Sequence, residues 1–176
     1  WHPVRGGARH YVHKLLPRIR DARLDSPVRR VRRVPPGGGQ AGVWVATDRG
    51  EERFDDVVLA CHSDQSLALL ADASEAERAW LGAIRYHPNR AVLHTDTSAM
   101  PRRPLAWAAW NYERAADNGQ EQAAVCLHYW INRLQPLPWK KPVIVSLNPA
   151  RELDPSKVIA CFDYSHPVFD LAAIDA

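Results

Sequence analysis

The sequence lacks the succession of a strand, a GxGxxG loop and a helix that cradles the phosphates of a dinucleotide, and it lacks a Walker-type loop. Its consecutive glycines, Gly37 to Gly39, follow two prolines between two expected strands, which favours a hairpin loop over a phosphate site. The GxSxG motif of many hydrolases is also missing. The chain therefore offers no glycine-based nucleotide site of its own.

Cysteine and long apolar runs are scarce as well. The three cysteines are far apart and form no CxxC pair, which argues against a disulfide framework and a structural zinc site and fits a reduced cytoplasm. No apolar run approaches the roughly 20 residues that a membrane-spanning helix needs. We therefore expect a cytoplasmic protein with no metal site and no transmembrane segment.

The net charge of +3 is mild and gives no reason to expect a nucleic-acid partner. Arginine is nevertheless concentrated near the start, above all at Arg29, Arg30, Arg32 and Arg33. One interpretation is a solvated edge strand whose charges discourage aggregation. The other is a surface for phosphate or anionic lipid. The residues leave both interpretations open.

The two ends of the sequence suggest a piece of a longer protein. The first residue is Trp1, and the single methionine is Met100. Residues 166–176 predict a helix that is capped by an aspartate and stops after barely two turns. We therefore expect an internal fragment.

Local patterns predict a first half of mixed structure. The spacing of apolar residues, together with the turn-forming residues between them, predicts a helix at 8–19 that Pro17 ends or kinks. It also predicts a β-hairpin of strands 28–34 and 42–47, a short buried strand at 57–60 that leads into a polar loop, and two helices at 67–70 and 74–84. Ser74 and Glu77 have the spacing of a capping box at the start of the last helix. A buried strand that feeds a loop and a helix is typical of an open α/β sheet.

The second half predicts an antiparallel sheet. Five short apolar or alternating segments, with no long helix between them, occur at residues 91–95, 105–112, 123–131, 144–147 and 158–164. The fold class is therefore α+β. We expect three parts: a partial cofactor-domain segment over residues 1–84, an antiparallel substrate domain over residues 85–165, and the start of a returning helix over residues 166–176.

Two strands of this half carry histidines that share a face with other polar residues. His94 alternates with Asp96, and His128 alternates with Cys126 and Trp130. Each histidine is either a hydrogen-bonded core residue or, if the sheet covers a cofactor, a proton-transfer residue.

The run from Cys61 to Asp64 contains all the residue types of a hydrolase triad. Adjacent residues point in different directions, however, and triad members converge from separate segments, so we expect no hydrolase site. Aromatic and amide side chains cluster further along the chain. They are either a packed sheet face or the walls of an apolar substrate pocket formed by Trp107, Trp110, Asn111, Tyr129 and Asn132.

Taken together, an ordered series of short motifs resembles one family. The series is GGAR with YV (6–12), HSDQ within 54–70, LHTD (93–96), MPRR (100–103), AWAAWNY (106–112), YWINRLQ (129–135), SLNP (146–149) and HPVFD (166–170). The chain resembles the FAD/NAD(P)-binding oxidoreductases of the flavin-containing amine oxidase superfamily along nearly its whole length. Some members are fused to, or encoded beside, cyclopropane-fatty-acid synthases.

The resemblance implies a Rossmann-like FAD domain, built discontinuously, and a substrate domain with an antiparallel sheet. It also implies that the strand from Val28 meets the adenine and that the loop of Ala60, Cys61 and His62 closes over the cofactor. The family's glycine motif and its second FAD motif would lie outside this sequence. We therefore expect FAD in an intact parent enzyme and an inactive fragment.

The substrate would be a small molecule or a lipid, with a link to fatty-acid modification by analogy. The catalytic base, the electron acceptor and the oligomeric state stay unassigned. The alternative is a non-enzymatic module that holds an acyl chain or lipid with its aromatic sheet and arginines.

Overall fold

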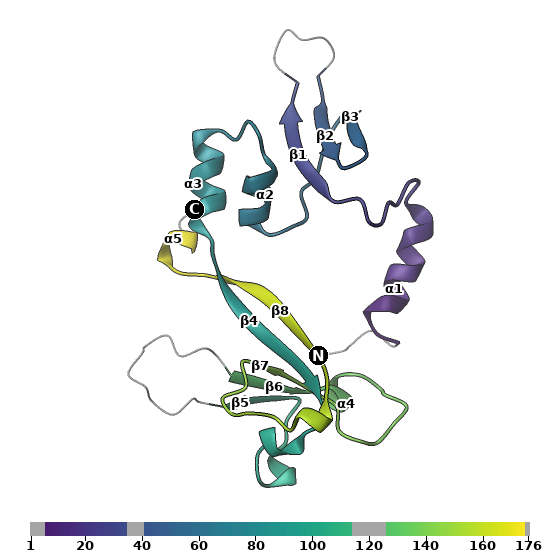
Figure 1. Ribbon diagram of the computed structural model, residues 1–176, viewed down its shortest axis with the longest axis vertical. Helices are drawn as coiled ribbons and strands as arrows, with labels where there is room; N and C mark the ends of the chain where they lie inside the picture. Colours follow the sequence, from purple (N-terminus) through teal and green to yellow (C-terminus); the bar gives the residue numbers. More distant parts are fainter. Residues whose placement is uncertain (1–5, 35–40, 114–125, 175–176) are drawn as a thin grey trace. The chain divides into compact units, whose positions relative to one another are not determined.

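The computed structural model describes residues 6–34, 41–113 and 126–174 (Figure 1). It has a mixed α+β fold with two antiparallel sheets. The chain divides into two compact units, each built from two separate segments. Unit 1 combines Trp1–Arg20 with Pro88–Ser165, and unit 2 combines Asp21–His87 with His166–Ala176. The three-part division that the sequence suggests stays a prediction.

Unit 2 begins with a three-stranded antiparallel sheet. Its strands follow one another in the order β1 (Val28–Arg33), β2 (Val43–Thr47) and β3 (Gly50–Phe54). The β1–β2 pairing confirms the predicted hairpin, whose Gly37–Gly39 loop lies outside the described residues. Strand β3 has no counterpart among the predicted elements. Its central residues are charged and give no apolar alternation, and Gly50 adopts a φ of 131° where the chain turns back from β2.

Two helices follow in unit 2. Helix α2 spans Ser63–Leu69 and starts earlier than predicted, because the preceding His62 caps it. Helix α3 spans Glu75–Ala83 and has the predicted capping box. Leu70, at the end of α2, forms a parallel bridge with Val31 of β1.

The strand predicted at Val57–Ala60 is wrong for the described residues, because none of their strands pairs with this run. A strand needs hydrogen-bonded neighbours for its backbone. The chain is nonetheless extended and alternating: Val57 and Leu59 are half-buried, whereas Val58 is 89% exposed. The run therefore has the side-chain pattern of a strand without a partner strand.

Unit 1 contains the predicted antiparallel sheet. The spatial order is β5-β6-β7-β4-β8, with bounds of Trp110–Glu113, Cys126–Trp130, Ile144–Leu147, Arg85–His94 and Val158–Val168. Short 3₁₀ turns replace the first part of the predicted strand at 105–112, and residues 123–125 lie outside the described part. Val92 of β4 packs with Ala99, Leu153 and Val158 in a small core.

The remaining helices are short. Helix α1 spans Ala8–Leu15 and passes into a 3₁₀ turn at Leu16–Arg18, which confirms the effect expected of Pro17. Helix α4 spans Ile131–Leu134, and helix α5 spans Leu171–Ile174. Asp170 caps α5 by accepting a hydrogen bond from the Ala173 amide at 3.0 Å, as predicted. No helix in the described part of the chain has the length and hydropathy needed to cross a bilayer.

Candidate functional site

The most unusual feature of unit 1 is a buried sheet face that carries polar side chains. Asn111 of β5, His128 of β6 and Ser146 of β7 are direct partners in neighbouring strands, and direct partners point to the same face. His94 of β4 lies beside them. His94 and Ser146 are fully buried, and His128 is 2% exposed. Buried polar groups are costly unless their hydrogen bonds are satisfied, so the partners of these residues matter.

A continuous hydrogen-bonded chain satisfies them. His94 Nε2 lies 2.7 Å from Ser146 Oγ, and the same oxygen lies 2.6 Å from His128 Nδ1. His128 Nε2 lies 3.0 Å from Glu113 Oε2. The backbone amide of Asp96 donates to His94 Nδ1 at 3.1 Å. We refer to His94, Ser146, His128 and Glu113 as the polar relay.

With both histidines neutral, the backbone contact of His94 Nδ1 sets one direction for the hydrogen bonds of the relay. His94 Nδ1 accepts from a backbone N–H, so the proton of a neutral His94 is on Nε2 and is donated to Ser146. The Ser146 hydroxyl then donates to His128 Nδ1, and the His128 Nε2 proton goes to the Glu113 carboxylate. Burial lowers the pKa of His94, which keeps the ring neutral as this order requires.

Glu113 connects the relay to the surface. Desolvation favours its protonated form, but the hydrogen bonds from His128 and Arg151 outweigh it and lower the pKa of Glu113. Arg151 donates to Glu113 Oε1 at 2.7 Å, which leaves Oε2 for His128. Cys126 is buried beside this pair, and burial raises the pKa of its thiol.

A cavity of about 430 Å³ opens next to the relay. Both Glu113 and His128 line it, together with Asn111, Arg102 and residues around Met100. A carboxylate, an imidazole and guanidinium groups facing one cavity can bind a polar ligand and exchange a proton with it.

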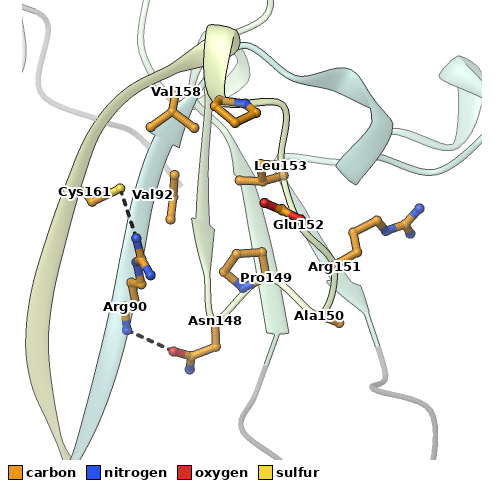
Figure 2. A pocket seen from close by; sticks show the side chains of 11 residues that line it. Arg90, Val92, Asn148, Pro149, Ala150, Arg151, Glu152, Leu153, Val158 and Cys161 are labelled. Atoms are coloured by element: carbon orange, nitrogen blue, oxygen red, sulfur yellow. Dashed lines mark hydrogen bonds between the residues drawn. The ribbon is translucent and has the colours of Figure 1, made fainter.

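A second cavity of unit 1, of about 700 Å³, lies between β4, β8 and the loop after β7 (Figure 2). Figure 2 shows Arg90 between Asn148 and Cys161. The Arg90 backbone amide donates to Asn148 Oδ1 at 2.9 Å, and its guanidinium is 3.7 Å from the Cys161 sulfur. This cavity therefore combines two arginines, a glutamate and an exposed thiol with an apolar wall at Val92 and Leu153.

The predicted aromatic pocket residues form two edge-to-face pairs. Trp107 packs against Trp130 at a centroid distance of 5.3 Å, and Trp110 packs against Tyr129 at 5.4 Å. Burial raises the pKa of Tyr129. Among the described residues, none of these four aromatic side chains lines the cavities of about 700, 430 and 380 Å³.

The two predicted orienting amides bind backbone instead of facing free space. Asn111 accepts from the Ala108 amide at 3.0 Å and donates to the carbonyls of Ala108 and His128. Asn132 accepts from the Val143 amide at 2.7 Å and donates to the carbonyl oxygens of Trp139 and Lys141. Of the five predicted substrate-pocket residues, Asn111 is the one that borders a described cavity.

The predicted cofactor-binding residues all lie in unit 2. Val28 starts β1 and pairs with Thr47, and Ala60 is exposed just before α2. Cys61 contacts Ser66 Oγ at 3.2 Å, whereas His62 stacks on Tyr86 at 4.5 Å. These separate partners give the Cys61–Asp64 run no convergent triad, and the role of the four residues toward FAD stays a prediction.

A third cavity, of about 380 Å³, lies in unit 2 beside the unpaired run. Its walls come from the hairpin, the helices α2 and α3, and the half-buried side chains of Val57 and Leu59. The inward side of this run therefore faces an open, mainly apolar cavity.

Sequence reasoning singled out His94, His128 and Cys126 but missed Glu113, Ser146 and Arg151. Ser146 begins the SLNP motif, but the resemblance assigns it no role, and Glu113 ends a strand with no motif around it. The one available signal was the alternation of polar residues on segments expected to be half-buried. In comparisons with known proteins, no protein-family model matches the chain, and no curated protein is significantly similar to it.

Proposed function

We propose that this chain is part of an FAD-dependent oxidoreductase of the flavin-containing amine oxidase type. The observation that carries the proposal is the way the chain is divided. Unit 2 is interrupted after His87 and resumes at His166, and the intervening residues build an antiparallel sheet. The motif resemblance implies the same arrangement: a discontinuous cofactor domain that is interrupted by an antiparallel substrate domain.

The unpaired run supports the proposal independently. Val57–Ala60 is extended, apolar and alternating, and it leads through Cys61 and His62 into the capped start of α2. In a Rossmann-like layer such a run would be a buried strand whose end meets the cofactor. Val58 would then be covered by the layer instead of being exposed.

Under this proposal the flavin supplies the redox chemistry, and the chain supplies binding and shape. Val28 and the loop of Ala60, Cys61 and His62 contact FAD. Unit 1 binds the substrate, a small molecule or a lipid, and the polar relay is a route for the proton that leaves it. The proposed cellular location is the cytoplasm.

A lipid-binding module without enzymatic activity is less well supported. Two of the four clustered arginines already have acidic partners: Arg29 forms a double hydrogen bond with Asp48, and Arg33 pairs with Asp72 and Glu77. The run is therefore no uncompensated cationic patch, and ion pairs on an exposed edge strand suit its interpretation as a solvated edge.

The decisive experiment is to express the complete reading frame that encodes this chain and to record its visible spectrum. We expect the purified protein to be yellow and to release FAD on denaturation, whereas the 176-residue chain binds FAD weakly or not at all. A complete protein that stays colourless, and that contains no flavin after denaturation and chromatography, would refute the proposal.

Replacing an alanine by arginine at two positions, one in the proposed cofactor loop and one outside it, tests that loop. Ala60→Arg places a large cation in this loop at an exposed position, so the fold should tolerate it while flavin binding is lost. Ala79→Arg makes the same change at an exposed position of α3 and should leave flavin content unchanged. Equal flavin content in both variants would remove Ala60 from the site.

A further inference from the structure

The end of the polar relay at Glu113 and His128 also gathers three metal-binding atoms. The Glu113 carboxylate, the Cys126 thiol and His128 Nε2 approach one another within 4.8 Å. Cys126 and His128 are at most 2% exposed, and Glu113 is half-buried. We propose that these three residues form a binding site for a divalent transition metal, with Zn²⁺ as the ion that fits best. The site does not rest on the flavin proposal, although it uses the Glu113 and His128 atoms that also join in the polar relay.

The separations of the three atoms match one face of a tetrahedron. Cys126 Sγ is 3.5 Å from His128 Nε2 and 3.9 Å from Glu113 Oε2, and the latter two atoms are 3.0 Å apart. Zinc bonds of about 2.3 Å to sulfur and about 2.0–2.1 Å to nitrogen and oxygen give tetrahedral edges of about 3.3–3.6 Å. Each observed separation is within roughly 0.4 Å of these values. Side-chain adjustments of that size need no change in the backbone.

The strand register explains why the three residues meet. Glu113 and Cys126 are direct partners in the β5–β6 pair, and His128 follows two residues later on the same face. The same backbone hydrogen bonds that hold the sheet therefore hold the ligand set. Sites built on paired strands are better defined than sites on loops.

The residues around the three proposed ligands are arranged as are those that orient metal ligands in proteins. Ser146 is hydrogen-bonded to the remaining ring nitrogen of His128, and His94 holds Ser146 from the other side. Arg151 holds the outer oxygen of Glu113, so that Oε2 points toward Cys126 and His128. Such contacts fix ring and carboxylate orientation, and losing one typically costs about 10–100-fold in metal affinity.

The donor set selects among metals. One thiolate, one imidazole and one carboxylate suit Zn²⁺ and Co²⁺, whereas Mg²⁺ and Ca²⁺ require oxygen ligands alone. Three protein ligands leave the fourth tetrahedral position open. Glu113 and His128 both border the cavity of about 430 Å³, so the open position has space for water or a small ligand.

Binding replaces the contacts among the three ligand atoms with three bonds to the metal. The His128 proton moves from Nε2 to Nδ1, the Ser146 hydroxyl turns its own proton away and accepts from both imidazoles, and the Cys126 thiol releases its proton to solvent. The thiolate and carboxylate then balance the charge of a divalent ion, while Arg151 keeps its hydrogen bond to the outer oxygen of Glu113.

Titration of the full chain with Co²⁺ alone tests the site, because cobalt reports its ligands in its absorption spectrum. We expect one equivalent to produce intense visible bands of tetrahedral cobalt and a near-ultraviolet thiolate-to-metal charge-transfer band, both of which Zn²⁺ abolishes by displacement. Cys126→Ser should remove the charge-transfer band. The matched control is the double variant with serine at the two exposed cysteines, Cys61 and Cys161, and it should retain the band.

Glu113→Gln provides a second test that preserves shape. It should weaken the cobalt affinity at least 10-fold while the circular dichroism spectrum stays unchanged. The proposal is overturned if the chain binds no cobalt, if cobalt binds without a thiolate band, or if the band survives Cys126→Ser. If Cys126→Ser fails to fold, Glu113→Gln decides alone: unchanged affinity overturns the proposal.

Discussion

Replacing Asp96 by asparagine should destabilise the chain by about 2 kcal/mol at neutral pH. Asp96 is 4% exposed and accepts backbone N–H hydrogen bonds from Asp154 and Ser98, at 3.0 and 3.1 Å. These bonds, led by that from Asp154, and the ammonium of Lys157 lower its pKa to about 2 from the usual 3.8. At about 1.4 kcal/mol per pKa unit, this shift corresponds to roughly 2 kcal/mol of stability.

The pH dependence gives the prediction its sign. The pKa of Asp96 is lower in the folded chain than in the unfolded one. The stability that its carboxylate contributes is therefore fully present well above pH 4 and is lost as the pH falls toward 2. About half of the contribution should remain at pH 3. Asparagine does not titrate, so the difference between the wild type and Asp96→Asn must shrink over this interval.

Urea unfolding followed by tryptophan fluorescence, at several pH values between 7 and 3, measures the loss of stability in Asp96→Asn and its dependence on pH. Asp163→Asn, at an exposed position of β8, is the matched control and should change the stability by less than about 0.5 kcal/mol. A difference for Asp96→Asn that stays constant from pH 7 to pH 3 would show that its carboxylate charge does not stabilise the fold and would refute the reasoning.

Three further predictions follow from local geometry. Gly42→Ala should destabilise the chain by about 1–3 kcal/mol in urea unfolding, because a Cβ there would lie 2.6 Å from the carbonyl oxygen of Phe54. Gly82→Ala in α3 should stabilise it by up to about 1 kcal/mol, because a Cβ there would meet only the Leu67 side chain of α2, at 3.9 Å. Ser74→Ala removes the N-cap of α3 and should cost about 1 kcal/mol in the same assay, whereas an unchanged midpoint would contradict the capping role. In a thiol assay on the native chain the two exposed cysteines should react quickly and Cys126 only after unfolding; three equally fast thiols would contradict its burial.

Local patterns predicted most elements, because their signals depend on neighbours in sequence. The capping box placed the start of α3, Pro17 ended α1, and alternation revealed the antiparallel sheet of unit 1. The failures concern segments whose state depends on distant partners. Val57–Ala60 has the apolar pattern of a strand, but the described residues contain no strand that pairs with it. Strand β3 has no apolar face and is defined by pairing with β2 alone.

The candidate site was predictable only in part, for the same reason. Alternation placed Cys126 and His128 on one face, and that much is visible in the sequence. The position of Glu113 opposite Cys126, and of Ser146 opposite His128, depends on strand register. Register is set by the packing of the whole sheet, and a shift of one residue would turn each side chain to the other face.

The interruption of unit 2 also has a consequence for the order of folding. Arg85, just after α3, pairs with Asp170 at the cap of α5, a separation of 85 residues. At a synthesis rate of about 5–20 residues per second, Asp170 follows Arg85 from the ribosome by roughly 4–17 s. Within that interval strands β4 to β7 have been synthesised and can pair, because sheets of this kind fold in milliseconds to seconds, whereas β8 ends at Val168 and emerges together with Asp170. The ion pair between Arg85 and Asp170 is therefore among the last contacts of unit 2 to form during synthesis.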